Sequence, residues 1–186
     1  MILDLGAISG ISKKLLFLHG KQNEAITGGW EGYSQKPVNE EHHYEIGETL
    51  YVHGHYSTDA VHYPTSIVGT VDPISMTNVN SIHFRVLNLY SEQPSAGKRA
   101  WRVGVASVED VERYTASYYD ADVAKFVACN NSNTYTGNGS TDGVYTLDVS
   151  NLTGDYYVFL YASYTADIIN GGEYLSAFEV DKILME

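Results

Sequence analysis

Apolar and polar side chains alternate along several short stretches of this 186-residue chain. The clearest stretch covers residues 81–90, where Ile82, Phe84 and Val86 would share one face. Residues 49–56 have the same period of two. Because successive side chains of a β-strand point to opposite faces, this period predicts strands with one buried face and one open to solvent.

Gly- and Asn-rich turns separate these strands from others of similar length. Further strands are predicted at residues 15–19, 66–71, 100–108, 144–149, 156–163 and 174–184. About eight to ten short strands with few or no helices indicate an all-β fold, and the long connections favour a jelly-roll β-sandwich of the galactose-binding-domain type. We expect a single such domain over residues 13–186, after a linker or assembly arm over residues 1–12.

The strand pattern also predicts local details of this sandwich. Residues 81–108 are expected to form a hairpin, and residues 21–47 a long loop with a packing or functional role. The side chains expected in the core are Phe84, Val86, Trp101, Val103, Tyr157 and Phe159.

The charge of the chain restricts its partners. Lys and Arg number 11 against 23 Asp and Glu, which gives a net charge of −12. Nucleic-acid backbones and anionic membrane surfaces attract clustered positive charge, so neither is expected as a partner. No apolar stretch approaches the length of about 20 residues that spans a bilayer. No secretory signal is recognised at Met1, so we expect a product made and folded in a cytoplasm.

Two segments resemble a known group of proteins. The first is LFLHGKQNEAITGGWEGYSQ, residues 16–35, in which two glycines precede Trp30. The second is YTLDVSNLTGDYY, residues 145–157. Both are similar to elements of the β-sandwich modules in tail and other virion proteins of phages that infect Gram-positive bacteria.

This resemblance implies a setting. It implies a virion structural and adhesion module in a tail fibre, baseplate or similar appendage, made in the host cytoplasm. Its expected partners are other virion proteins, further copies of the same chain, and host-surface glycans. The alternative is a carbohydrate-binding module of a secreted or cell-wall hydrolase. The two differ because a virion module should be an oligomer, whereas the alternative should be a monomer with measurable glycan affinity.

Metal and catalytic motifs are sparse in this sequence. His53 and His55 share a strand face but supply only part of a zinc site, so no metal site is predicted. A structural calcium ion at Asp120 and Asp122, or at Asp142, is left open, since jelly-roll glycan-binding modules often carry one. No nucleophile motif or phosphate-binding loop is present, and no cofactor or enzymatic activity is expected.

Aromatic side chains in polar loops are the remaining candidates for a ligand site. Sugar rings stack on Tyr and Trp, while Asn and Asp hold their hydroxyl groups. Tyr135 is the first choice because it lies in the polar loop 130–143. The predicted ligand-binding residues are Tyr135, Asn133, Trp30, Tyr33, Tyr118 and Tyr119. For Trp30, the resemblance also suggests a second role as the anchor of its loop.

Overall fold

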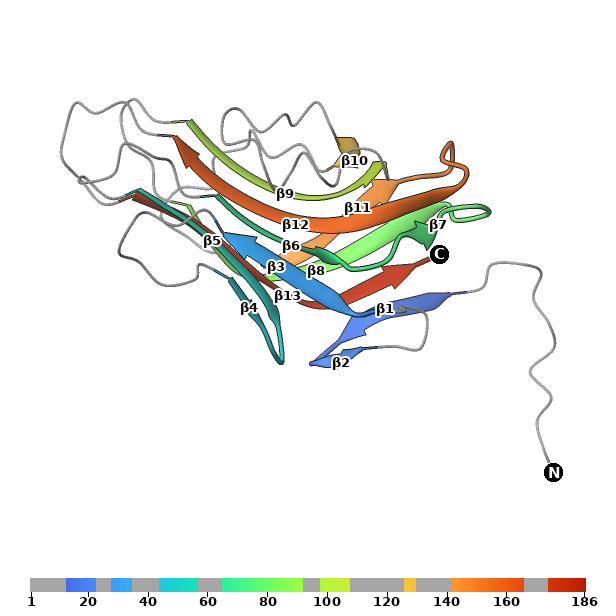
Figure 1. Ribbon diagram of the computed structural model, residues 1–186, viewed down its shortest axis with the longest axis horizontal. Helices are drawn as coiled ribbons and strands as arrows, with labels where there is room; N and C mark the ends of the chain where they lie inside the picture. The colour runs from blue at the N-terminus through green and yellow to red at the C-terminus, as the bar shows by residue number, and fades with distance from the viewer. Residues whose placement is uncertain are drawn as a thin grey trace.

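The computed structural model describes residues 13–22, 28–34, 44–56, 65–91, 98–107, 126–129, 142–165 and 174–186. These residues form the strands labelled in Figure 1 and contain no helix. The strands are β1 (Lys14–Leu18), β2 (Lys21–Gln22), β3 (Trp30–Ser34), β4 (Tyr44–Ile46), β5 (Leu50–Tyr56), β6 (Thr65–Thr70), β7 (Ile74–Ser75), β8 (Ser81–Ser91), β9 (Lys98–Ser107), β10 (Phe126–Cys129), β11 (Gly143–Asp148), β12 (Asp155–Thr165) and β13 (Tyr174–Met185).

The strands pair into two antiparallel sheets. The seven-stranded sheet has the order β11-β8-β13-β1-β2, with β5 also paired to β13 and β4 paired to β5. The six-stranded sheet has the order β10-β9-β12-β6-β3, with β7 paired to β12. The chain passes repeatedly from one sheet to the other, as Figure 1 shows. The predicted all-β jelly-roll β-sandwich is therefore confirmed.

Two local predictions are wrong. Residues 81–108 do not form a hairpin, because β8 pairs with β11 and β13, whereas β9 lies in the other sheet and pairs with β10 and β12. Residues 21–47 are not one long loop, because β2, β3 and β4 lie within them. The assignment of residues 1–12 to a linker lies outside the described residues and stays a prediction.

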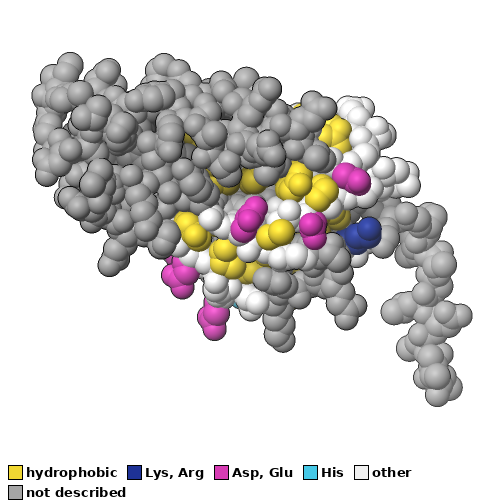
Figure 2. Space-filling view, viewed as in Figure 1, with side chains coloured by type: hydrophobic (Ala, Val, Ile, Leu, Met, Phe, Trp, Pro, Cys, Tyr) yellow, Lys and Arg dark blue, Asp and Glu magenta, His cyan; other side chains and the backbone are white. Residues whose placement is uncertain are grey.

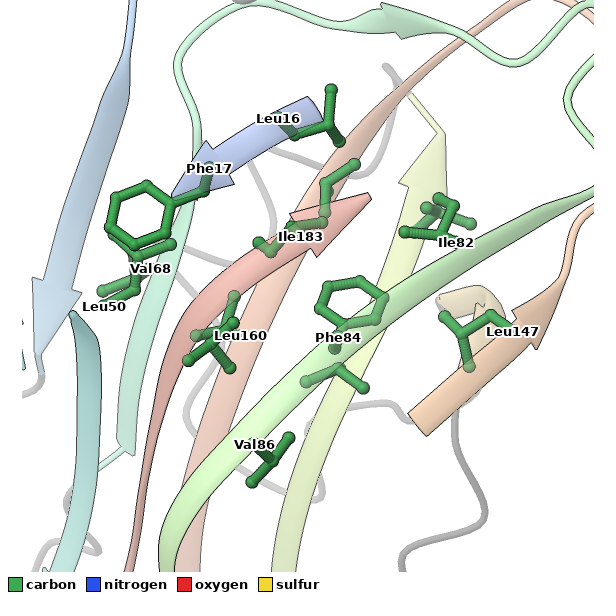
Figure 3. Close-up of a cluster of buried hydrophobic side chains, with 14 of the residues drawn as sticks. Leu16, Phe17, Leu50, Val68, Ile82, Phe84, Val86, Leu147, Leu160 and Ile183 are labelled. Carbon is green, nitrogen blue, oxygen red and sulfur yellow. The ribbon is translucent and has the colours of Figure 1, made fainter. Parts of the chain in front are cut away.

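The core lies between the two sheets. Trp101 from β9 meets the rings of Tyr145 and Phe178 from the opposite sheet edge-on, at centroid distances of 4.9 and 5.4 Å. Phe17 and Trp30 make a similar contact across the sandwich at 6.0 Å. Other buried side chains that point into this space are labelled in Figure 3: Leu16, Leu50, Val68, Ile82, Phe84, Val86, Leu147, Leu160 and Ile183. Burial of Phe84, Val86, Trp101 and Val103 confirms their predicted core positions.

Strand β12 is apolar on both faces. Val158 and Leu160 face the core. Phe159 is buried as predicted, but it belongs to a second cluster on the outer face of the six-stranded sheet, and Tyr157 at its border is only half-buried. The buried members of this second cluster are Ile67, Ala106, Phe159 and Tyr161. The six-stranded sheet is therefore buried on both faces along β12.

The Gly-Gly pair before Trp30 forms a turn that only glycine adopts easily. Gly28 and Gly29 have φ values of 87° and 83°, in the region that side chains with a Cβ disfavour. The carbonyl of Gly29 accepts a hydrogen bond from the backbone N–H of Val71 at 3.0 Å. This turn starts β3 opposite the end of β6, where Trp30 pairs with Thr70. Its effect is to place the Trp30 ring in the core.

Candidate functional site

A row of aromatic and polar side chains crosses the outer face of the seven-stranded sheet. On β5, Leu50 and Val52 are fully buried, so Tyr51 between them points outward. Tyr51 pairs with Glu45 of β4 on one side and with Glu179 of β13 on the other. Directly opposed side chains of antiparallel strands stand about 5 Å apart at Cβ, so both carboxylates adjoin the Tyr51 ring.

A β-bulge in β8 extends this row. Glu179 pairs with Leu87, and the register between β8 and β13 then shifts. Asn88 has a φ of 49°, a left-handed conformation that Asn tolerates better than most residues. Leu89 is thereby fully buried while Asn88 is exposed on the outer face. Bulges often re-aim a side chain beside a functional site.

Asn88 makes two hydrogen bonds within the row. Its amide Nδ2 donates to Oε1 of Glu179 at 3.1 Å, and its backbone N–H donates to Oδ1 of Asp142 at 2.8 Å. Asn88 therefore fixes the carboxylate of Glu179 and ties the segment before β11 to the same face. We call Glu45, Tyr51, Asn88, Asp142 and Glu179 the Tyr51 row.

The electrostatics of the row keep its phenol neutral. Partial burial raises the pKa of Tyr51, and the nearby carboxylates of Glu179 and Glu45 raise this pKa further. The Tyr51 hydroxyl therefore remains protonated at neutral pH and can both donate and accept a hydrogen bond. The ring of His53 adjoins it, at a centroid distance of 6.0 Å and a tilt of 51°. The row thus sets a half-buried tyrosine ring between two carboxylate acceptors.

A neighbouring ion pair on this face serves the fold. Arg85 of β8 donates to both carboxylate oxygens of Asp181, through Nε at 2.6 Å and through Nη2. This hydrogen bonding raises the pKa of Arg85. Asp181 stands at a second register shift, between Val180 and Lys182 of β13. The bidentate pair therefore holds that irregularity in place.

A serine and a histidine meet at the start of β8, but without the geometry of a nucleophilic site. Oγ of Ser81 lies 3.0 Å from Nε2 of His83. A catalytic acid would have to orient the other ring nitrogen, yet Nδ1 lies 2.9 Å from Oγ1 of Thr146. The nearest carboxylate, Glu186, lies 3.5 Å from Nε2, on the serine side of the ring. These contacts fix the orientation of the His83 ring, which is a structural role.

Metal ligands are not gathered in the described part of the chain, where no group of three or more His, Cys, Asp or Glu side chains could hold an ion. Asp142, one of the residues considered for calcium, binds the backbone N–H of Asn88. The other two, Asp120 and Asp122, lie outside the described residues, so the calcium site stays a prediction. The described residues also include no helix long and apolar enough to cross a membrane.

A buried arginine lies on the outer face of the other sheet. Arg102 of β9 is 4% exposed and donates from Nη1 to the carbonyl of Trp101 at 3.0 Å. Burial lowers the pKa of its guanidinium, and burial raises the pKa of the neighbouring Cys129 thiol. This protonated thiol is a weak nucleophile, which agrees with a packing role for Cys129.

The ligand-binding residues predicted from sequence are not brought together by the described structure. Four of them, Asn133, Tyr118, Tyr119 and Tyr135, lie outside the described residues and stay predictions. The backbone of Tyr33 lies in β3. Trp30 is 7% exposed and packs on Phe17. Its position agrees with the anchoring role that the resemblance suggested and offers no open ring to a ligand.

Sequence reasoning missed the Tyr51 row, although part of its signal was present. The alternation over residues 49–56 puts Tyr51 and His53 on the strand face opposite Leu50 and Val52. What the sequence lacked was the register that places Glu45 and Glu179 on either side of Tyr51. Glu45 lies on the preceding strand β4, whereas Glu179 comes from β13, more than 120 residues further along the chain.

Comparison with known proteins leaves the family of this chain open. The chain matches no protein-family model and no curated protein. Among solved structures it is similar to a low affinity xylan binding module, CBM86, from the xylanolytic gut symbiont Roseburia intestinalis. The identity is 14%, the TM-score is 0.37, and the match covers 94% of this chain and 95% of that one. At this identity and TM-score, the likeness carries no inference about a ligand.

Proposed function

We propose that this chain is a non-catalytic adhesion module that binds glycans through the Tyr51 row. The observation that carries the proposal is the placement of Tyr51 between two carboxylates on an outer sheet face. An aromatic ring presents a flat apolar surface to the C–H face of a sugar. Carboxylate and amide groups around it hold sugar hydroxyls, which are strong donors and acceptors.

The same geometry favours binding over hydrolysis. Glycoside hydrolysis needs two carboxyl groups on opposite sides of the scissile bond. Glu45 and Glu179 instead project from one sheet face, with Tyr51 standing between them. The Tyr51 side chain therefore occupies the place between the two carboxyl groups, where a scissile bond would have to lie.

For the setting, we propose a phage virion appendage, in which the module assembles with other virion proteins and with further copies of itself. The support is the resemblance of residues 16–35 and 145–157 to virion β-sandwich modules. The net charge of −12 agrees with a protein or glycan partner. On the face seen in Figure 2, acidic side chains of the described residues lie singly among apolar and uncharged ones. A carbohydrate-binding module of a cell-wall hydrolase would use the same row, and the mass of the native assembly separates the two settings.

The direct test is glycan and host-wall binding by Tyr51→Ala. We expect binding to weaken by about tenfold or more, which corresponds to about 1.4 kcal/mol or more. Tyr156→Ala is the matched control, because Tyr156 is a half-buried tyrosine on β12, in the other sheet. Tyr135→Ala tests the loop predicted from sequence. Loss of binding in Tyr135→Ala with no change in Tyr51→Ala would place the site in that loop and reject the Tyr51 row.

A further inference from the structure

We infer that the Tyr51 row selects sugars by charge and takes amino sugars that carry a free, positively charged amine. This inference rests on the proposed glycan binding and names the ligand class of the same site. It is drawn from the chemistry of the row, in which an aromatic ring, two flanking carboxylates and a fixed amide lie side by side on four neighbouring strands.

Hydrogen-bond capacity is the first argument. A carboxylate is an acceptor only, so a ligand can hydrogen-bond to Glu45 and Glu179 only through its own donor groups. Within the described residues, the one hydrogen bond to Glu179 comes from Asn88 and occupies Oε1. An ammonium group supplies three donors and would meet acceptors on both sides of the ring. An acetylated amine supplies one donor and no charge.

Charge and ring chemistry give the second argument. A cation over the face of a tyrosine ring is attracted by the ring quadrupole. Two carboxylates beside the ring add direct attraction, and Asp142 adds a third negative charge further along the row. The guanidinium of Arg85, one step along β8, is neutralised by Asp181. Uronic acids and phosphate-bearing glycans would meet repulsion at the same place.

The Asn88 bulge makes the row rigid before a ligand arrives. A free glutamate side chain loses rotamer freedom when it binds, which weakens affinity. The hydrogen bond from Nδ2 of Asn88 restrains Glu179 in advance. We therefore assign Asn88 as a positioning residue that acts through Glu179.

The test compares three sugars on the full chain by titration calorimetry. The probes are glucosamine oligomers with free amines, N-acetylglucosamine oligomers of the same length, and oligogalacturonate. Measurements at about pH 6 keep an amine of ordinary pKa protonated. We expect the free-amine oligomer to bind at least about tenfold more tightly than the acetylated one, and the anionic oligomer not to bind.

Variants that each replace one glutamate by glutamine test which residues cause the preference for the free-amine sugar. Glu179→Gln and Glu45→Gln should each reduce that preference several-fold, because each should weaken binding of the free-amine sugar far more than binding of the acetylated one. Glu31→Gln removes the same charge from an exposed position on β3 of the other sheet and should change neither affinity. Asn88→Gly keeps a backbone that tolerates the φ of 49° and removes only the amide, so it should weaken the free-amine sugar without loss of stability.

Each contrary outcome has a distinct meaning. Equal binding of the free and acetylated sugars, abolished by Tyr51→Ala, would overturn the charge inference and leave the proposed function standing. An equal loss in Glu31→Gln and Glu179→Gln would show attraction to the overall net charge, and would overturn the inference too. Binding of none of the three sugars would overturn the inference, and no binding to host-wall glycans as well would remove the proposed function.

Discussion

Trp101 offers the sharpest test of how the two sheets are held together. Its side chain is 3% exposed and contacts Tyr145 and Phe178 of the opposite sheet. A buried tryptophan removes about 150–250 Å² from water, worth about 4–6 kcal/mol at 25 cal/mol per Å². Measured truncations of Phe and Trp to Ala cost about 3–5 kcal/mol. We therefore expect Trp101→Ala to lower the free energy of unfolding by about 4 kcal/mol.

Trp101→Phe separates packing from hydrogen bonding at this position. The indole Nε1 is buried and has no acceptor in the described part of the chain. An unsatisfied buried donor costs about 1–3 kcal/mol, so its removal offsets much of the lost ring volume. We expect Trp101→Phe to cost about 1 kcal/mol.

Urea unfolding followed by circular dichroism measures both changes. With a urea m-value of about 2 kcal/mol per M, the Ala variant should lower the midpoint by about 2 M and the Phe variant by about 0.5 M. Equal losses of unfolding free energy in Trp101→Ala and Trp101→Phe would show that the buried indole N–H does not destabilise the folded protein. A loss near zero in Trp101→Ala would refute the packing between the sheets.

Two further predictions address the turn before β3 and the acid stability. Gly28→Ala should destabilise the fold by more than Gly154→Ala, although both glycines have positive φ. A Cβ at Gly28 would lie only 3.1 Å from Cβ and Cγ1 of Val71, whereas a Cβ at Gly154 would have open space around it. The φ penalty alone is about 1–2 kcal/mol, and equal losses in thermal unfolding would disprove the collision. The hydrogen bond from Lys13 lowers the pKa of Glu186 below its usual 4.5, so its stabilising contribution is complete above that pH and is lost as the pH falls through the lowered value. In Lys13→Met, the free energy of unfolding should therefore fall less steeply with decreasing pH below about pH 4.5. An unchanged slope would exclude a contribution from the interaction between Lys13 and Glu186.

The strands and their inward faces could be predicted because they depend on local sequence. Alternation correctly placed Phe84, Val86, Trp101 and Val103 in the core. It could not decide between the two faces of β12, because that strand is apolar on both, and Phe159 packs on the outer face. Period two identifies a strand whose two faces differ, and β12 lacks that contrast.

Pairing between strands is the information that the sequence did not contain. Strands β8 and β9 are consecutive, which favoured a hairpin, yet each completes a different sheet. The Tyr51 row could not be predicted from the sequence for the same reason. Tyr51 and Glu179 become neighbours only through the pairing of β5 with β13. The shift that exposes Asn88 also depends on this long-range register. The sequence gives the type of side chain at each position, but it does not show which side chains lie close together in the fold.

The central position of β13 has a consequence for how the molecule can fold during synthesis. This strand pairs with β1, β5 and β8, although it is the last strand of the described chain. Until residues 174–185 leave the ribosome, those three strands lack the strand that joins them into one sheet. The apolar faces of the strands therefore stay exposed to water. Folding dominated by such distant pairings is slow and leaves strand edges open to other chains. A nascent or truncated chain that ends before β13 should therefore depend on chaperones and aggregate readily, even if all of the residues that fill the opposite sheet are already present.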